Sequence, residues 1–291
     1  MSADAPAAGA LRLGTRGSPL ALAQAALVAQ AIGAPVQTVV IATGGDAGAG
    51  VDKRRWVDTI EAALLAGEVD LAVHSAKDVP GELADGLELA GAPVREDPRD
   101  ALCGAGSIAA LARGARVGTS SLRRAAQLRA LRDDLDVGEL HGNLDTRLRR
   151  LQEGDFDAIV LAVAGLRRLG RDGWSALDEL VPAPGQGTLA LEARAADARV
   201  AAAIAPLRDG GAERALAAER ALVRGLGAGC DTPVGAFARD AGTGRLALSA
   251  FVGAPDGSYW IRDELQGEDP VALGEAVAQR LLSAGAGELL G

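Results

Sequence analysis

Short runs of valine, isoleucine and leucine alternate with helical patterns along the first two thirds of the chain. Glycine, serine, proline or charged residues bound each run, as is typical of strands that end in turns. The predicted strands are Leu11–Leu13, Gln37–Ala42, Leu71–His74, Arg116–Gly118, Asp136–Leu140, Ala158–Ala162 and Thr188–Glu192. This alternation predicts an α/β fold with mixed, largely parallel sheets.

The pattern changes in the last third of the chain. Here Val234–Ala238, Arg245–Val252 and Ser258–Gln266 predict a three-stranded antiparallel meander, and glycine-containing turns separate them. A helical pattern over Glu213–Leu226 precedes the meander, and a second over Pro270–Ala284 is expected to cover it.

Two proline-containing segments, Pro93–Asp100 and Val181–Gly187, resemble linkers between domains. If both cross between the same two lobes, the chain leaves the first domain, builds the second and returns. We therefore expect domain 1 over 11–93, completed by 188–206, and domain 2 over 98–181. A smaller α+β domain 3 would span 210–291.

Composition limits the functional classes. The 291 residues are 48% hydrophobic and 2% aromatic, which is enough to bury a large core, and no apolar run approaches the length of a membrane span. The start of the chain lacks the charged and apolar parts of a signal peptide, so we expect a cytoplasmic protein with no membrane partner. Two cysteines and two histidines make a metal site or a structural disulfide improbable.

The formal net charge of −9 argues against a nucleic-acid partner, yet arginines are clustered. Local cationic sites on an acidic protein favour small anionic ligands. Lysine occurs only at Lys53 and Lys77, which suggests that these two positions need a compact ammonium group.

Three predicted strand-to-helix junctions place an arginine beside a capping residue. They are Thr15–Leu20 with Arg16 and Ser18, Gly118–Arg124, and Gly142–Arg147. A single capped helix is usually only a capped helix, but free amides, a hydroxyl and a guanidinium together form a cradle for an anion. Because guanidinium groups bind carboxylates in a bidentate manner, three such junctions predict a polycarboxylate ligand of modest size.

Two further segments carry reactive side chains. His74–Pro80 places Lys77 and Asp78 directly after an apolar strand, where Asp78 suits proton transfer or the stabilisation of a cation; the alternative is a surface turn with an ion pair. Cys230 lies in a glycine-rich loop after a basic helix and is a candidate for covalent attachment. The alternative for Cys230 is an inert buried thiol.

Six motifs in order resemble the porphobilinogen deaminase (hydroxymethylbilane synthase) family, from Leu11 to the C-terminus. They are Arg16–Ala21, His74–Pro80, Gly118–Arg124, Gly142–Leu148, Ala164–Gly170 and Gly229–Gly235. The resemblance implies two lobes like those of periplasmic binding proteins and a third domain that carries one covalent dipyrromethane cofactor. It also implies an enzyme, a transferase of tetrapyrrole and heme biosynthesis, that condenses four porphobilinogen molecules with ammonia release and then hydrolyses off hydroxymethylbilane.

The resemblance assigns roles to residues by position. Cys230 would carry the cofactor thioether, and Asp78 would be the catalytic carboxylate that stabilises the cation formed as ammonia leaves. The cofactor-binding positions would be Lys77, Thr119, Ser121, Arg123, Arg124 and Arg147, and the substrate-binding positions Arg16, Ser18, Arg168, Lys53, Trp56 and His141.

Two departures from the family pattern concern the last of these residues. His141 stands where the family usually has an arginine, and an imidazole is shorter and only partly charged near neutral pH. Between Asp46 and Trp56 the chain is shorter than in relatives, which end this loop with Lys-Gly-Leu-Phe. We hypothesise that Trp56 replaces that phenylalanine near the cofactor; the alternative is an anchoring tryptophan on an amphipathic helix.

Two other functions fit parts of the sequence. A cytoplasmic domain that binds a small polycarboxylate would explain the arginines but would leave Cys230 and Asp78 without a purpose. A degenerate relative with poor turnover would explain His141 and the short loop. A monomer fits a chain whose own domains enclose its site.

Overall fold

The computed structural model describes residues 9–42, 54–229 and 232–290, and the side chains of residues 54–56 are not described. The chain forms two compact units. Unit 1 comprises Met1–Arg95 and Thr188–Glu213, and unit 2 comprises Glu96–Gly187 and Arg214–Gly291. No helix in the described part combines the length and the apolar character needed to cross a bilayer.

Unit 1 is built on a five-stranded sheet in the order β2-β1-β3-β10-β4. β1 pairs in parallel with β2 and β3, whereas β10 is antiparallel to both β3 and β4, so four of the five strands share one direction. The strands are β1 Leu11–Thr15, β2 Val36–Val40, β3 Leu71–Ser75, β4 Leu87–Gly91 and β10 Leu189–Arg194. The helices are α1 Pro19–Ile32, α2 Arg54–Leu65 and α6 Ala198–Ile204, with single 3-10 turns at η2 Ala76–Asp78 and η3 Ala205–Leu207.

The two faces of this sheet are covered by different helices. Side chains alternate across a strand, so Val73 of β3 faces one way and Ala72 the other. Val73 packs in a core cluster with Val28 of α1, and Ala72 packs in a separate cluster with Leu64 of α2. The apolar runs of the sequence therefore become strands that are buried on both sides.

Unit 2 contains a second five-stranded sheet, in the order β7-β6-β8-β5-β9. As in unit 1, one strand runs opposite to the others. Here β5 is the reversed strand, antiparallel to β8 and β9, and β6 pairs in parallel with β7 and β8. The elements are β5 Asp100–Cys103, β6 Arg116–Gly118, α3 Leu122–Leu131, β7 Asp136–Gly138, α4 Leu144–Gln152, β8 Ala158–Ala162, α5 Val163–Arg168 and β9 Trp174–Leu177.

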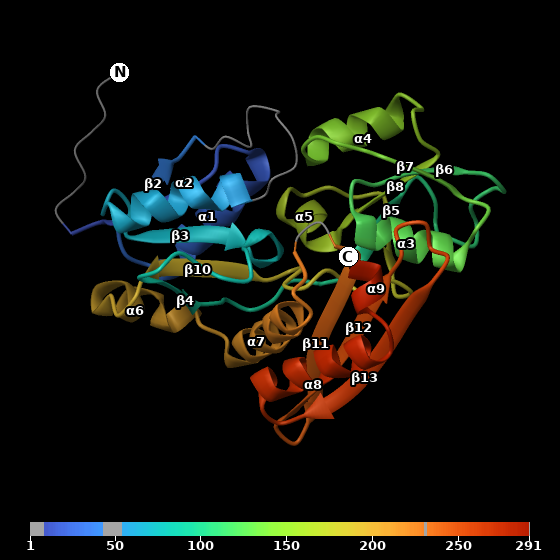
Figure 1. Cartoon of the computed structure of the whole chain (residues 1–291). Coiled ribbons are helices and arrows are strands. Elements are labelled where there is room, and N and C mark those ends of the chain that lie inside the picture. The colour runs from blue at the N-terminus through green and yellow to red at the C-terminus, as the bar shows by residue number, and fades with distance from the viewer. Residues whose placement is uncertain (1–8, 43–53, 230–231, 291) are drawn as a thin grey trace. The chain divides into compact units, whose positions relative to one another are not determined.

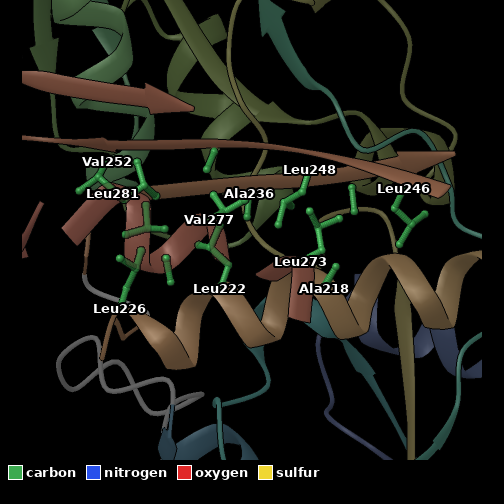
Figure 2. Close-up of a cluster of buried hydrophobic side chains, with 14 of the residues drawn as sticks. Ala218, Leu222, Leu226, Ala236, Leu246, Leu248, Val252, Leu273, Val277 and Leu281 are labelled. Carbon is green, nitrogen blue, oxygen red and sulfur yellow. The ribbon is translucent and has the colours of Figure 1, made fainter. Parts of the chain in front are cut away.

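The C-terminal part of unit 2 is an antiparallel meander covered by helices, as the sequence predicts. Figure 1 shows α7 and α8 along this three-stranded sheet. Leu222 of α7, Val277 of α8 and Leu248 of β12 are fully buried between them (Figure 2). The elements are α7 Gly210–Gly225, β11 Val234–Gly242, β12 Arg245–Gly253, β13 Trp260–Gly267, α8 Pro270–Ser283 and α9 Gly287–Leu290.

The meander is bonded to the rest of unit 2. Ala236 N donates to Pro182 O at 2.9 Å, and Arg262 Nη2 donates to Glu179 O at 3.0 Å. The predicted division of this part of the chain into domains over 98–181 and 210–291 stays a prediction, as does the extent of domain 1.

The predicted fold class is confirmed by these sheets. Each predicted strand is found, within a few residues of its predicted ends. Three strands, β4, β5 and β9, were not predicted, and β5 begins at Asp100, the last residue of the predicted first linker.

Candidate active site

Unit 1 carries a group of candidate site residues at the edge of its sheet where two parallel neighbours end. β1 ends at Thr15 and β3 ends at Ser75, and the two strands pair through Leu13 and Leu71. Because the carboxyl ends of parallel neighbours share one edge, the segments that follow them are brought together. Those segments contain the predicted residues Arg16, Ser18, Lys77 and Asp78.

Ser18 caps α1 as the sequence predicts. Its hydroxyl accepts a hydrogen bond from Ala21 N at 3.3 Å, and Pro19 is the first helical residue. Thr15 Oγ1 donates to Ala21 O at 3.2 Å, which joins the end of β1 to the first turn of the helix. The half-buried Arg16 therefore lies beside a helix N-terminus, where partial positive charge favours an anion.

Lys77 and Asp78 lie on η2, directly after β3, and both are half-buried. Ala76 N donates to Thr188 O at 3.0 Å, and Gln24 Nε2 of α1 donates to Ser75 Oγ at 2.8 Å. These two bonds fix the start of the turn, so the backbone that carries Lys77 and Asp78 is held at the sheet edge.

Unit 2 carries candidate anion-binding junctions of its own, built in the same way. β7, β6 and β8 are parallel neighbours, and three helices follow their carboxyl ends. Ser121 caps α3 by accepting from Arg124 N at 3.4 Å, and Asn143 caps α4 by accepting from Thr146 N at 2.9 Å. Buried Thr119 accepts from Ser121 N through its hydroxyl at 3.2 Å. All three predicted capped junctions are thus present.

Arg123 and Arg124 are bound to a carboxylate of the protein itself. Arg123 Nη1 donates to Asp100 Oδ2 at 2.7 Å and to Val181 O at 2.6 Å, and Arg124 Nε donates to Asp100 Oδ1 at 2.9 Å. Gln186 Nε2 adds a bond to the same Oδ1 at 2.9 Å. Burial alone would raise the pKa of Asp100, but the two guanidinium charges outweigh it and hold that pKa far below its usual range.

Comparison with known proteins decides the family. The sequence model of "Porphobilinogen deaminase, dipyromethane cofactor binding domain" matches residues 11–202, and that of "Porphobilinogen deaminase, C-terminal domain" matches residues 213–283. The porphobilinogen deaminases of Roseiflexus sp. (strain RS-1) and Rubrobacter xylanophilus are 50% and 48% identical to this chain. The alignments cover 96% and 98% of this chain and 98% and 97% of the relatives. The chain belongs to the porphobilinogen deaminase family.

The predicted family, the enzyme class and the dipyrromethane cofactor are confirmed by these matches. Among solved structures, a periplasmic substrate-binding protein from Coxiella burnetii and immunogenic lipoprotein A from Vibrio vulnificus are each 16% identical to this chain. Their TM-scores are 0.44 and 0.45. Each comparison covers 70% of this chain, together with 94% of the Coxiella protein and 96% of the Vibrio protein.

The donor set fits a porphobilinogen deaminase cofactor with carboxylate arms. Arg123 Nε is buried, and no described residue accepts a hydrogen bond from it. A buried guanidinium N–H without an acceptor is costly, and a ligand carboxylate is the kind of group that would satisfy it. In the described ranges, 9–42, 54–229 and 232–290, no three histidine, cysteine or acidic side chains are grouped as metal ligands would be.

The remaining cationic positions of unit 2 differ in burial. Arg147 is half-buried, and its Nε donates to Gly142 O at 2.7 Å. Arg168 Nη2 donates to Gly187 O at 2.7 Å, and burial lowers the pKa of this guanidinium while the charge of Glu96 opposes the shift. His141 is exposed, and its Nε2 lies 2.9 Å from exposed Glu139 Oε2. The ligand roles of these three residues stay predictions.

Four positions named in the sequence analysis are not described in full. Cys230 and Lys53 lie outside the described residues, as does Asp46, and Trp56 lies within α2 but its side chain is not described. The residues before Cys230 follow the predicted helix end, because Gly227 takes φ +62° and Ala228 N closes the last turn on Val223 O at 3.1 Å.

Sequence reasoning missed three acidic residues that are buried in the fold. Asp100 falls at the end of a predicted linker and Glu192 at the end of a predicted strand, yet neither carboxylate is exposed. Fully buried Glu219 of α7 accepts from Gly185 N at 2.6 Å and from Ala238 N at 2.8 Å. An acidic residue within an apolar run was the available signal for Glu192.

Proposed function

We propose that this chain is a hydroxymethylbilane synthase that joins four porphobilinogen molecules head to tail and then releases the linear tetrapyrrole by hydrolysis. The construction of the sheet edges supports the proposal most strongly. Capped helix N-termini with neighbouring arginines follow parallel strands in both units, and Asp78 lies on a fixed turn at one of these edges.

The dipyrromethane group, held by a thioether to Cys230, would supply the free pyrrole carbon to which the first substrate is joined. In each addition, the C–N bond of a substrate aminomethyl group breaks and ammonia leaves. A C–C bond would form between that methylene carbon and the free pyrrole carbon, from which a proton would leave. Water takes part only in the final release.

Asp78 carries the electrostatic role in this proposal. Positive charge develops on the substrate pyrrole as ammonia leaves, and a half-buried carboxylate stabilises such charge better than one in bulk water. The same group is suited to accept the proton that each condensation releases.

The anion-binding positions would hold the acetate and propionate arms of cofactor and substrate. We assign this role to Arg16, Ser18, Lys77, Thr119, Ser121, Arg123, Arg124, Arg147 and Arg168, with Lys53, Trp56 and His141 as further substrate contacts. A growing chain tethered at Cys230 would present each new end at high effective concentration, so one carboxylate could serve every addition.

Intact mass of the purified protein tests the proposal. We expect a surplus equal to two linked pyrrole units in the wild type, no surplus in Cys230→Ser, and an unchanged surplus in Cys103→Ala, because Cys103 is buried in the core of unit 2. Incubation with porphobilinogen should then add whole pyrrole units to the wild type. Absence of any surplus, even after that incubation, would contradict the proposal and favour a polycarboxylate-binding domain.

A further inference from the structure

Three titratable side chains are buried together on the α2 face of the unit 1 sheet. His74 of β3, Glu192 of β10 and Glu61 of α2 are 7%, 0% and 7% exposed. His74 Nε2 lies 2.9 Å from Glu192 Oε2. None of the three belongs to the capped junctions described above, and a buried group of this kind persists only where its charges are compensated.

The oxygens of Glu192 need a donor. Neither oxygen accepts a hydrogen bond from the described residues, and the contact with His74 is an ion pair. Glu61 lies within hydrogen-bonding reach of Glu192. A proton on the Glu61 carboxyl group would supply the missing donor and would remove the repulsion between two buried carboxylates.

The surroundings of Glu61 favour that proton. Burial raises the pKa of Glu61 first, the negative charge of Glu192 raises it further, and Asp58 of α2 acts in the same direction. A hydrogen bond from Ala84 N opposes these effects only in part. Charged residues on the other strands that contact α2 are engaged elsewhere: Arg12 with Asp70, Glu88 with Ala196 N, and Arg194 with Leu64 O and Val69 O.

The cluster also joins the two ends of the segment that carries Lys77 and Asp78. His74 immediately precedes this segment and contacts Glu192. At its other end, Ala84 N donates to Glu61 Oε1 at 3.4 Å. Glu61 and Glu192 therefore bridge residues 74 and 84, and the proposed catalytic turn lies between these two anchors.

We propose that Glu61, Glu192 and His74 form a proton-holding cluster that positions the segment carrying Lys77 and Asp78. Glu61 acts in it as a positioning residue, with its proton shared toward Glu192 and its other oxygen accepting from Ala84. The effect on catalysis rests on the proposed function, whereas the proton and the anchoring of the segment do not.

The test compares wild type with Glu61→Gln, Glu61→Ala and the control Glu68→Gln, whose carboxyl group is exposed just beyond the same helix. Glutamine keeps a donor toward Glu192 and an acceptor for Ala84, whereas alanine removes both. Amide hydrogen exchange of peptides that cover 74–84 should rise at least tenfold in Glu61→Ala but change less than twofold in Glu61→Gln and Glu68→Gln. In the assay of ammonia release, kcat of Glu61→Ala should fall about tenfold or more with a smaller change in KM, and Glu61→Gln should restore most of it.

Stability against pH gives a readout that needs neither cofactor nor substrate. The pKa of Glu61 is raised in the folded state, so its stabilisation is fully present below the unfolded pKa and is lost as pH rises through the folded pKa. The Tm of wild type and of Glu68→Gln should therefore fall with rising pH over a window in which Tm of Glu61→Gln stays level.

Each result decides the proposal. Parallel Tm curves for wild type and Glu61→Gln would show that Glu61 holds no proton and would overturn it. Unchanged exchange over 74–84 in Glu61→Ala would overturn the anchoring of the segment. If wild type itself releases no ammonia, the proposed function fails, and the exchange and pH measurements still decide the cluster.

Discussion

Replacing Asp100 with asparagine should destabilise unit 2 by about 3 to 5 kcal/mol, the usual cost of removing one partner from a buried ion pair. Asp100 is fully buried, and Arg123 and Arg124 are only 3% and 5% exposed. The variant leaves two guanidinium charges without a counter-charge. The NH2 group of the asparagine would also face guanidinium N–H groups, so hydrogen-bond donors would lie against donors. Water cannot screen charges that are this deeply buried, so the upper part of the range is expected.

Urea unfolding followed by circular dichroism measures this change. For a unit of this size a loss of 3 to 5 kcal/mol corresponds to a fall in Tm of about 6 to 20 °C. The matched control is Glu153→Gln, which removes the acidic partner of an exposed pair with Arg149 on α4. That change should alter the free energy of unfolding by less than about 0.5 kcal/mol. A free energy for Asp100→Asn within about 1 kcal/mol of wild type would refute the reasoning.

Lowering the pH should reduce the difference in the free energy of unfolding between wild type and Asp100→Asn. The pKa of Asp100 is lowered in the folded state, so its contribution is present above the unfolded pKa, about 4, and is lost as pH falls toward the folded pKa. The variant has no carboxyl group at this position to titrate. If the difference in the free energy of unfolding stays constant from pH 7 to pH 3, the negative charge of Asp100 is not the source of its stabilising effect.

Two further predictions follow from burial and charge. Asp78→Asn should lower the rate of ammonia release by about 100-fold or more while Tm changes little, because it removes a charge from a half-buried side chain without changing its size; an unchanged rate would exclude Asp78 from catalysis. Burial raises the pKa of Cys103 to about 11, with Arg124 opposing the shift, so only about a thousandth of this thiol is ionised at pH 8 and iodoacetamide should label it slowly until urea unfolds the protein. Rapid labelling of Cys103 in the native protein would contradict that prediction.

The pattern of apolar residues was sufficient to predict the strands that are buried on both faces. β3 and β8 are nearly continuous apolar runs, and the structure places helices over them, so local pattern and tertiary position agree. The strands that escaped prediction lack this signal. β4 has a glutamate and ends in glycine at the sheet edge, and β5 has only four residues, so pairing with neighbours rather than local pattern defines them.

The helix starts of the site could be predicted because capping is local chemistry. Ser18, Ser121 and Asn143 each satisfy an amide three residues ahead, and that relation is written in the spacing of the sequence.

The binding partners of the arginines could not be predicted, because a guanidinium group binds a carboxylate of the protein as readily as a carboxylate of a ligand. Asp100 is 23 residues from Arg123 along the chain, and only the position of β5 in the sheet brings the two together. Arg147, near the cap of α4, donates from its Nε to the carbonyl of Gly142 and is half-buried. In an arginine-rich chain, the arginines that bind buried carboxylates of the protein therefore stabilise the fold. Which carboxylates are buried becomes known only when the pairing of the strands is known.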